Sequence, residues 1–586
     1  MKLTRAGFLA LFAGIAIVAC SSSGGGGSIA DAGAGGEGDS SSKAGSSSKG
    51  GSSSQGGSHT TDPVTCEDYA YVSNGLACPQ TGCPAFRCDC GEDFPISLTS
   101  CTPDGCLLGA DCDVLCAQGL EGGFKCLDTY SVDPSLVPGG GTGGSGGSGG
   151  MPPAPMCQAS DVKRPPTSSV QLPAGTDSTR LLSDSSGNLY LAGTVPEKDA
   201  VDFGGGPLPG GKRLFLVKLD SKGRHVWSRR FGSQFGLETV ETLAFAPDGS
   251  LLMGGITPMD TDLGGGPEPT STVAQLYAVR YDTDGKFLKS YLLPSSNAVP
   301  HLAGVAQMPN GEVNFWGDFS AEFKAGATTL TPKGEADIFF VRFSAAGSIL
   351  DAKSFGDKRN DLLFDVVTDA LGNTYLLGFS YYKLDFGSNP IDLGTNALSF
   401  VVCLNSAQTP VWQKLVGSGG SYPRRALLDQ DELVVVGDAY GDVYYDNSAS
   451  GALPSGSVYA LRVDTADGSL LSADTYAPKK TGTHVSALSL LSDGGLLIGG
   501  YAQPPADFGG GLLSGGVGSD PFALRVDAAG AHQWSTFFCA TGNADVTAAG
   551  HDGSSPVLLV EYSKDLSLGD EQHTGYGTVL LEMNDQ

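Results

Sequence analysis

A glycine-rich segment, VDFGGGPLPGG at residues 201–211, is the first place in the sequence where chemistry could reside. Glycine-rich loops expose backbone N–H groups, and several nucleotide sites hold phosphates in this way. In a nucleotide-binding P-loop, a Lys-Ser/Thr pair that opens a helix follows the glycines, and this segment has no such pair after it. Related segments begin at residues 261, 321, 384 and 506. We therefore expect turns of a repeated fold, and four copies carry an aromatic residue that would pack inward: Phe203, Phe323, Phe386 and Phe508.

Metal ligands have no clear pattern in the sequence. The segment DTDGKF at 282–287 resembles the start of a calcium loop, but the glycine and glutamate that should follow are absent. We expect a hairpin turn there and keep bound calcium as the alternative. The seven histidines form no HxH or HExxH group, although distant ones could converge in the fold. The sequence thus predicts no metal site, no cofactor and no catalytic residue, and it leaves the ligand-binding residues unassigned.

A cation recurs at the fourth position of an apolar strand pattern that first occurs as FLVKLD at residue 215. The seven copies carry Lys218, Arg280, Arg342, Cys403, Arg462, Arg525 and Glu582 at this position. Five cations lining a channel could bind an anion, or each could pair with a carboxylate or extend along the surface. We favour the structural roles. Cys403 has no histidine near it in sequence, so we expect a small buried residue there and not a nucleophile.

A dense group of cysteines lies ahead of these repeats. Its ten members are Cys66, Cys78, Cys83, Cys88, Cys90, Cys101, Cys106, Cys112, Cys116 and Cys126. An even number of cysteines in a short segment of an exported protein indicates a disulfide framework. Zinc is the alternative, but the group lacks paired C-x-x-C knuckles and contains no histidine. We predict a small disulfide-stapled domain over residues 63–130, with its pairing left open.

The N-terminus explains why export is expected. Lys2 and Arg5 precede an apolar run that is too short to span a bilayer comfortably and ends in IVAC at Cys20. This segment resembles the lipobox of bacterial lipoproteins, which implies that residues 1–20 are a signal peptide and that Cys20 is acylated. Ser21 resembles the sorting pattern of outer-membrane lipoproteins. An ordinary cleaved signal with a chance cysteine is the alternative.

Two segments are typical of linkers, and the overall charge restricts the partners. Residues 21–62 are rich in Ser and Gly and nearly free of apolar side chains, so they predict a flexible tether with a mean reach of roughly 35 Å. Residues 131–156 form a second, Gly/Pro-rich linker. The net charge of −28 argues against a nucleic-acid partner, which would require a basic surface.

Residues 157–586 repeat with a period of about 61 residues. A turn followed by an apolar strand recurs from SGNLYLAG at 186 onward, and the marker positions are 187, 249, 311, 372, 432, 494 and 553. The cation-bearing strand keeps the same spacing, and Trp227, Trp412 and Trp534 mark a third element in some copies. Each copy contains about four short strand patterns separated by turn residues. The sequence therefore predicts an all-β fold, a seven-bladed β-propeller.

The ends of this repeat region indicate how the ring closes. The last copy lacks its tryptophan-type strand, whereas an extra strand pattern, SSVQLPAG, precedes the first copy at residue 168. We expect this N-terminal strand to complete the final blade and remove an exposed edge.

At the same residues the chain resembles the bacterial SBBP β-propeller repeats, whose pattern of GNxYxxG followed by an FVxKLDxxGxxxW-like segment is matched best by the first and fourth copies. The resemblance implies a propeller but no catalytic set. We expect a lipid-anchored, non-catalytic binding or scaffolding protein at the outer membrane or cell surface of a Gram-negative bacterium. Its partner would be an extracellular protein or glycan. The alternative is an extracellular polysaccharide hydrolase or lyase with carboxylates in the channel.

Overall fold

The computed structural model divides the chain into two compact units, residues 1–149 and 150–586. In the first unit it describes four short strands. In the second it describes residues 161–586 except 234–237, 259–260, 269–270, 272, 296–298, 388–390, 418–419, 441–442, 447–456, 478–481, 517, 554 and 586. Among the described residues, no helix is long and apolar enough to cross a membrane.

The strands of the first unit form two hairpins. β1 (Phe86–Asp89) pairs with β2 (Pro95–Leu98), and β3 (Cys101–Thr102) pairs with β4 (Gly105–Cys106), where Cys101 lies opposite Cys106. Cys20 and the cysteines at 66, 78, 83, 90, 112, 116 and 126 lie outside the described residues. The disulfide framework and the acylation of Cys20 therefore stay predictions.

The second unit is built from sheets of four antiparallel strands, and the described residues form seven of them. The first sheet contains β6 (Asp177–Ser183), β7 (Leu189–Thr194), β8 (Leu214–Leu219) and β9 (His225–Phe231). The second contains β10 (Thr242–Phe245), β11 (Leu251–Thr257), β12 (Gln275–Tyr281) and β13 (Phe287–Pro294). The third contains β14 (His301–Gln307), β15 (Val313–Phe319), β18 (Asp337–Phe343) and β19 (Ile349–Phe355). The fourth contains β20 (Asp361–Thr368), β21 (Thr374–Leu384), β22 (Ile391–Leu404) and β23 (Pro410–Val416).

The remaining sheets follow the same order. The fifth contains β24 (Ser421–Asp429), β25 (Glu432–Ala439), β26 (Val458–Asp464) and β27 (Leu470–Tyr476). The sixth contains β28 (His484–Leu490), β29 (Leu496–Ala502), β30 (Asp520–Val526) and β31 (His532–Phe537). The seventh contains β33 (Ala544–His551), β34 (Pro556–Tyr562), β37 (Gly577–Glu582) and β5 (Ser168–Gln171). Further short strands lie in the connections between these strands: β16 (Phe323–Ala325), β17 (Thr328–Leu330), β32 (Cys539–Ala540), β35 (Leu566–Ser567) and β36 (Gln572–His573).

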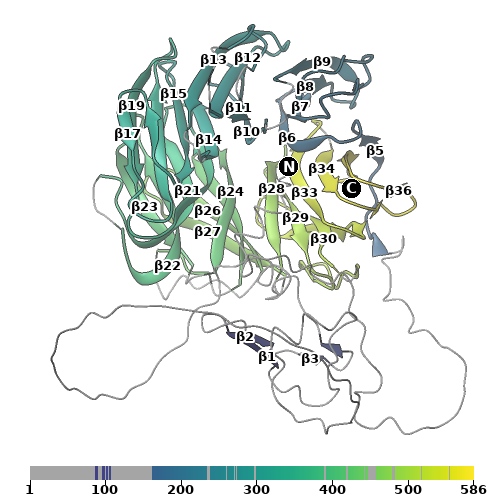
Figure 1. The fold of residues 1–586 in the computed structure, drawn as a ribbon. Helices are drawn as coiled ribbons and strands as arrows, with labels where there is room; N and C mark the ends of the chain where they lie inside the picture. Colours follow the sequence, from purple (N-terminus) through teal and green to yellow (C-terminus); the bar gives the residue numbers. More distant parts are fainter. Residues whose placement is uncertain are drawn as a thin grey trace, which may run out of the picture. The chain divides into compact units, whose positions relative to one another are not determined.

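The sheets are arranged around a common centre. The first strand of each sheet contacts the first strand of the next, in the order β6, β10, β14, β20, β24, β28, β33 and back to β6 (Figure 1). Sheets arranged radially in this way form a β-propeller, which confirms the fold class expected from the repeats.

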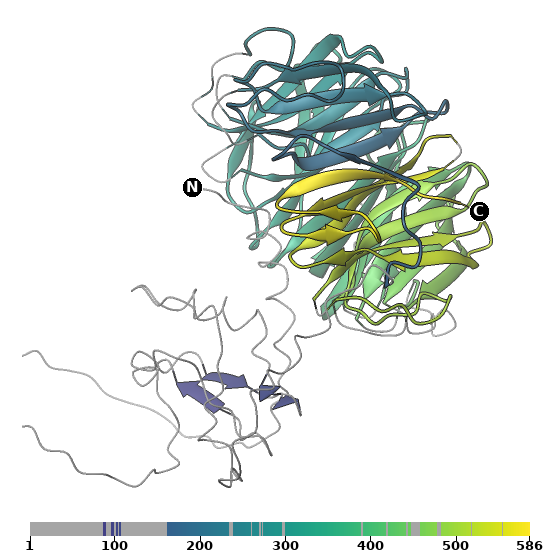
Figure 2. The ribbon, with the colours of Figure 1, turned by 90° about the vertical axis from the view of Figure 1, so that its right-hand side faces the viewer.

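The ends of the repeat region meet in the seventh sheet. β5 pairs with β37, with Gln171 opposite Val579 and Ser168 opposite Glu582, so an N-terminal strand completes the last sheet as the sequence predicts. Figure 2 shows the C-terminal strands beside the N-terminal strands of this unit. The pairing satisfies backbone groups that would otherwise form an open edge.

The second and third strands of each sheet have continuous apolar sequences because neighbouring sheets cover both of their faces. β7 and β30, for example, are buried along their whole length. The tryptophans of the outer strands connect neighbouring sheets, since Trp227 Nε1 donates to Thr283 O (3.1 Å) and Trp412 Nε1 donates to Thr465 O (2.9 Å). Gly285 fits against the Trp227 ring, where a Cβ would come within 2.8 Å of ring carbon.

Candidate functional site

The glycine-rich loops satisfy their own backbone donors. The Asp202 carboxylate accepts hydrogen bonds from Gly204 N (2.8 Å) and Gly206 N (2.9 Å), and Asp507 does the same in its own copy. These N–H groups are therefore not presented to a phosphate. The aspartate at the start of four of the five loops (Asp202, Asp262, Asp385 and Asp507) was the signal for this arrangement in the sequence.

The aromatic residues of these loops pack as expected. Phe323, Phe386 and Phe508 are buried, and Phe203 is half-buried. Phe508 stacks on Phe522 with their ring centroids 4.8 Å apart, and Phe203 lies 4.7 Å from Phe215. These four loops are turns, each anchored by an aromatic ring.

The segment DTDGKF forms a hairpin turn between β12 and β13. Asp282 Oδ1 accepts hydrogen bonds from Asp284 N (3.0 Å) and Lys286 N (2.8 Å), which confirms the turn. In the part of the chain that the structure describes, no group of three or more His, Cys, Asp or Glu side chains is placed to hold a metal ion.

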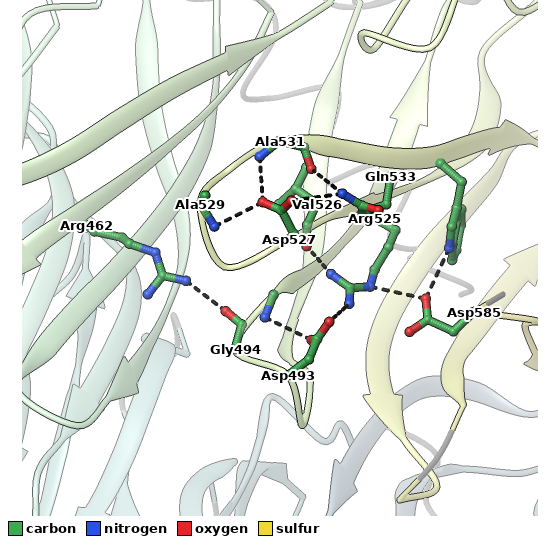
Figure 3. A network of polar contacts seen from close by, with 12 residues as sticks. Arg462, Asp493, Gly494, Arg525, Val526, Asp527, Ala529, Ala531, Gln533 and Asp585 are labelled. Carbon is green, nitrogen blue, oxygen red and sulfur yellow. Dashed lines mark hydrogen bonds and ion pairs between the residues drawn. The ribbon is translucent and has the colours of Figure 1, made fainter.

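The repeated cations form ion pairs within and between sheets. Arg462 pairs with Asp429 (3.0 Å) and Glu432 (2.9 Å) of its own sheet, and it also donates to Gly494 O (2.9 Å) of the next sheet. Arg525 is buried and pairs with Asp493 and, at 3.2 Å, with Asp585 (Figure 3).

The other members of the set have similar partners. Arg280 pairs with Asp248, and Arg342 lies 3.9 Å from Glu312, while the Lys218 ammonium lies over the Tyr190 ring. Of the interpretations left open by the sequence (anion binding, carboxylate pairing and extension along the surface), carboxylate pairing is the one observed for the four arginines. The set stabilises the repeat.

Cys403 is a buried free thiol in the third strand of the fourth sheet. Burial raises the pKa of this thiol to about 12, so the thiolate is disfavoured at neutral pH. This confirms the expectation of a small buried residue.

Neighbouring first strands are joined by polar contacts near the centre of the ring. Arg180 Nε donates to Glu241 O (2.9 Å), Ala426 N donates to Asp365 Oδ2 (2.8 Å), and Ser486 Oγ donates to Asp545 Oδ2 (2.7 Å). The sequence separations of these pairs are 61, 61 and 59 residues, so the contacts join equivalent positions of the repeat. Burial raises the pKa of Asp365, although its neighbour Arg425 opposes the shift.

The pairing of the first strands with the second strands is irregular in the fourth and fifth sheets, at Phe364 and Arg424, whose side chains contact each other. The register between β20 and β21 shifts between Leu363 and Asp365, and that between β24 and β25 shifts between Pro423 and Arg425. The residues at these bulges are Phe364 and Arg424. Corresponding shifts occur in the first strands β6, β14, β28 and β33, so the bulge is a feature of the repeat, and what differs in the fourth and fifth sheets is the side chain that it carries.

Near these bulges, five aromatic residues form a continuous row across the fourth and fifth sheets. We call this row the aromatic stripe. They are Phe364, Phe379, Tyr381, Tyr422 and Tyr440. The ring centroids are 5.1 Å apart from Tyr381 to Phe379, 5.7 Å from Phe379 to Tyr422 and 6.3 Å from Tyr422 to Tyr440. Phe364 lies 6.1 Å from Tyr422. Tyr440 is 48% exposed, whereas Phe379 is largely buried and the other three are half-buried.

An ion pair fixes Arg424 beside these rings. Its Nε and Nη2 atoms donate to the two oxygens of Asp438 at 2.7 and 3.1 Å, a bidentate geometry that holds the guanidinium plane in one orientation. The same guanidinium lies 4.7 Å from the Tyr422 centroid and 5.1 Å from that of Phe364. Asp438 is buried, so this ion pair is a fixed polar group beside the rings of the stripe.

His484 extends this region into the sixth sheet. Its ring stacks on Tyr501 with centroids 5.2 Å apart, and its Nδ1 lies 3.6 Å from Asp438 Oδ1. Burial and the nearby Arg424 lower the pKa of His484 to about 3. The imidazole is therefore neutral at physiological pH and offers hydrogen bonding without charge.

The stripe combines accessible aromatic rings with fixed polar groups, and it contains no activated nucleophile. Such a surface can bind a ligand by stacking and hydrogen bonding. None of these residues stands out in the sequence as a candidate site. The signal was present as a departure from the repeat, since segments such as SYPRR at 421–425 and GDAY at 437–440 place aromatic and basic residues together.

Comparison with protein-family models gives no match, and comparison with curated protein sequences gives none either. Among solved structures, BamB from Moraxella catarrhalis is 11% identical with a TM-score of 0.32, covering 71% of this chain and 97% of its own. Chaetomium thermophilum Sqt1, bound to the N-terminus of the ribosomal protein L10, is 10% identical with a TM-score of 0.33, covering 70% of this chain and 99% of its own. Similarity at this level does not assign a family or a function to the chain.

Proposed function

We propose that the chain is a non-catalytic binding or scaffolding protein whose seven sheets are the blades of a seven-bladed propeller that contacts a protein or glycan partner. The aromatic stripe carries this proposal. It is a region where an exposed tyrosine, further rings and a fixed guanidinium lie together, and tyrosine and arginine contribute heavily to binding energy at interfaces. The repeated arginines are engaged with carboxylates of the repeat, which favours the stripe over them as a binding surface.

The proposed location comes from the N-terminal sequence. Acylation of Cys20 would anchor the protein in the outer membrane or at the cell surface, because several acyl chains together give stable membrane attachment. Residues 21–62 would tether the rest, residues 63–130 would be held by disulfides, and the repeats would follow the 131–156 linker. SBBP-type repeats are part of the same proposal and are supported by the residue patterns described above.

Co-purification of the full-length lipoprotein from membranes tests the proposal. Tyr440→Ala removes the most exposed ring of the stripe, and Tyr576→Ala removes a ring that is also 48% exposed but directly precedes β37 of the seventh sheet. We expect an envelope protein or glycan to co-purify with the wild type and with Tyr576→Ala, and its recovery to fall with Tyr440→Ala. Equal recovery from both variants would assign binding to another surface.

The second candidate function is a polysaccharide hydrolase or lyase. The observation that favours it is the raised pKa of Asp365, since a general acid needs a carboxylate that keeps its proton. Depolymerisation of a polysaccharide by the full-length protein, lost in Asp365→Asn, would establish this candidate. Absence of any depolymerisation would leave the binding role.

A further inference from the structure

We infer that the aromatic stripe binds an acidic glycan, a polysaccharide that carries carboxylate groups. This inference rests on the proposed binding function and names the class of its ligand. It depends on three features of the stripe: its extended row of rings, the unpaired cations at one end and the small apolar area that it exposes.

The row of rings suits a chain-like ligand. Tyr381, Tyr422 and Tyr440 lie along one line of contacts that crosses from the fourth sheet to the fifth, with the largely buried Phe379 between the first two. A sugar ring has a face of C–H groups that can lie on an aromatic ring and a rim of hydroxyls that need hydrogen-bond partners. Several rings in a row therefore fit consecutive sugar units better than they fit a single small molecule.

Fixed hydrogen-bond donors lie beside the rings. Arg424 uses Nε and Nη2 for Asp438, so Nη1 has no hydrogen-bond acceptor among the described residues. The ion pair holds the donor in place before a ligand arrives, which lowers the entropy lost on binding. Neutral His484 offers a further polar group that does not repel an anion.

Two exposed cations lie at one end of the row, where the Glu335 carboxylate is also close to Tyr381. Arg359 is exposed and its guanidinium lies 5.6 Å from the Tyr381 ring centroid, and Lys358 beside it is also exposed. Neither side chain forms an ion pair with a carboxylate of the described residues. The nearby Glu335 is hydrogen-bonded to Asn360 (2.9 Å). In a chain with a net charge of −28, two exposed cations beside an aromatic row favour an anionic ligand.

A protein partner fits these features less well. A stable protein interface buries about 800 Å² on each partner, with an apolar centre. Of the five stripe residues only Tyr440 exposes a large part of its surface; Phe379 is largely buried and the other three are half-buried. The accessible apolar area is therefore small and divided, as sugar units require.

Titration calorimetry on the full-length, detergent-solubilised protein tests the inference with polygalacturonate, alginate and hyaluronate as acidic glycans and dextran as the neutral control. We expect an acidic glycan to bind and dextran not to bind. Tyr440→Ala should weaken binding roughly tenfold. Arg359→Gln should weaken it about fivefold and reduce its dependence on salt. Tyr576→Ala should bind like the wild type, and thermal unfolding checks that each variant is folded.

The outcomes separate the inference from the function on which it rests. Equal affinity for dextran would overturn the acidic class, and binding that is insensitive to both Tyr440→Ala and Arg359→Gln would overturn the site. Loss of all glycan binding together with a Tyr440-dependent protein partner would overturn this inference and leave the proposed function standing. Absence of any Tyr440-dependent partner would overturn both.

Discussion

Asp361 is a carboxylate whose burial should make the stability of the propeller depend on pH. It begins the first strand of the fourth sheet, is fully buried, and accepts hydrogen bonds from Asp357 N (2.9 Å) and from Ser380 Oγ. Burial, and to a lesser degree the charges of Asp337 and Asp357, raise its pKa from 3.8 to about 7. Asp337 is also buried, and its Oδ1 has no hydrogen-bond partner among the residues that the structure describes.

The sign of the effect follows from proton binding. Because the folded state holds this proton more tightly than the unfolded state does, the stabilisation is complete below pH 3.8 and is lost as the pH rises through about 7. A difference of about 3 pKa units at ~1.4 kcal/mol each gives a loss of about 4 kcal/mol as an upper bound. Asp361→Asn cannot ionise and should not lose this contribution.

Urea denaturation followed by tryptophan fluorescence at pH 5 and pH 8 measures the effect. The wild type should lose a few kcal/mol more than Asp361→Asn between these two pH values, so the variant should gain in relative stability at pH 8. Glu335→Gln, which removes an exposed carboxylate nearby, should follow the wild type. If the wild type and Asp361→Asn change in parallel with pH, the reasoning about this buried carboxylate is refuted.

Three further predictions test other parts of the account. Gly285→Ala should lower the free energy of unfolding by about 1–3 kcal/mol, because Gly285 has φ +74° and a Cβ would press on the Trp227 ring. Gly249→Ala, at φ +79° with no atom within 4 Å of its Cβ, should lower it by less, and calorimetry that ranks the two oppositely would count against the packing argument. Cys403 in the native protein should react with a thiol reagent only as fast as the protein unfolds, and rapid labelling at pH 8 would contradict its burial and raised pKa. Cys20→Ser should abolish incorporation of labelled palmitate and release the protein from the membrane fraction, whereas unchanged labelling would disprove the lipobox.

The architecture of the second unit was predictable because it follows from repetition. Period, turn residues and continuous apolar strands recur in every copy, and the missing last strand with its N-terminal replacement indicated the pairing of β5 with β37. The structural role of the arginines was also predictable, although their partners were not, because a partner such as Gly494 lies in the next copy.

The stripe could not be predicted with the same methods. It depends on bulges at Phe364 and Arg424, and a bulge changes which way a side chain points without changing the apolar pattern of the strand. It also joins residues from two different copies, so no single segment contains it. The relevant signal was the difference between copies, which an argument based on their likeness disregards.

Photo-cross-linking in intact cells tests the central claim most directly. A benzophenone amino acid replaces Tyr440 in one strain and Tyr576 in another, two positions of equal exposure. If the stripe is the binding surface, light should produce a discrete adduct at Tyr440 and none at Tyr576. An adduct at Tyr576 alone, or none at Tyr440 in cells that display the protein, would contradict the claim.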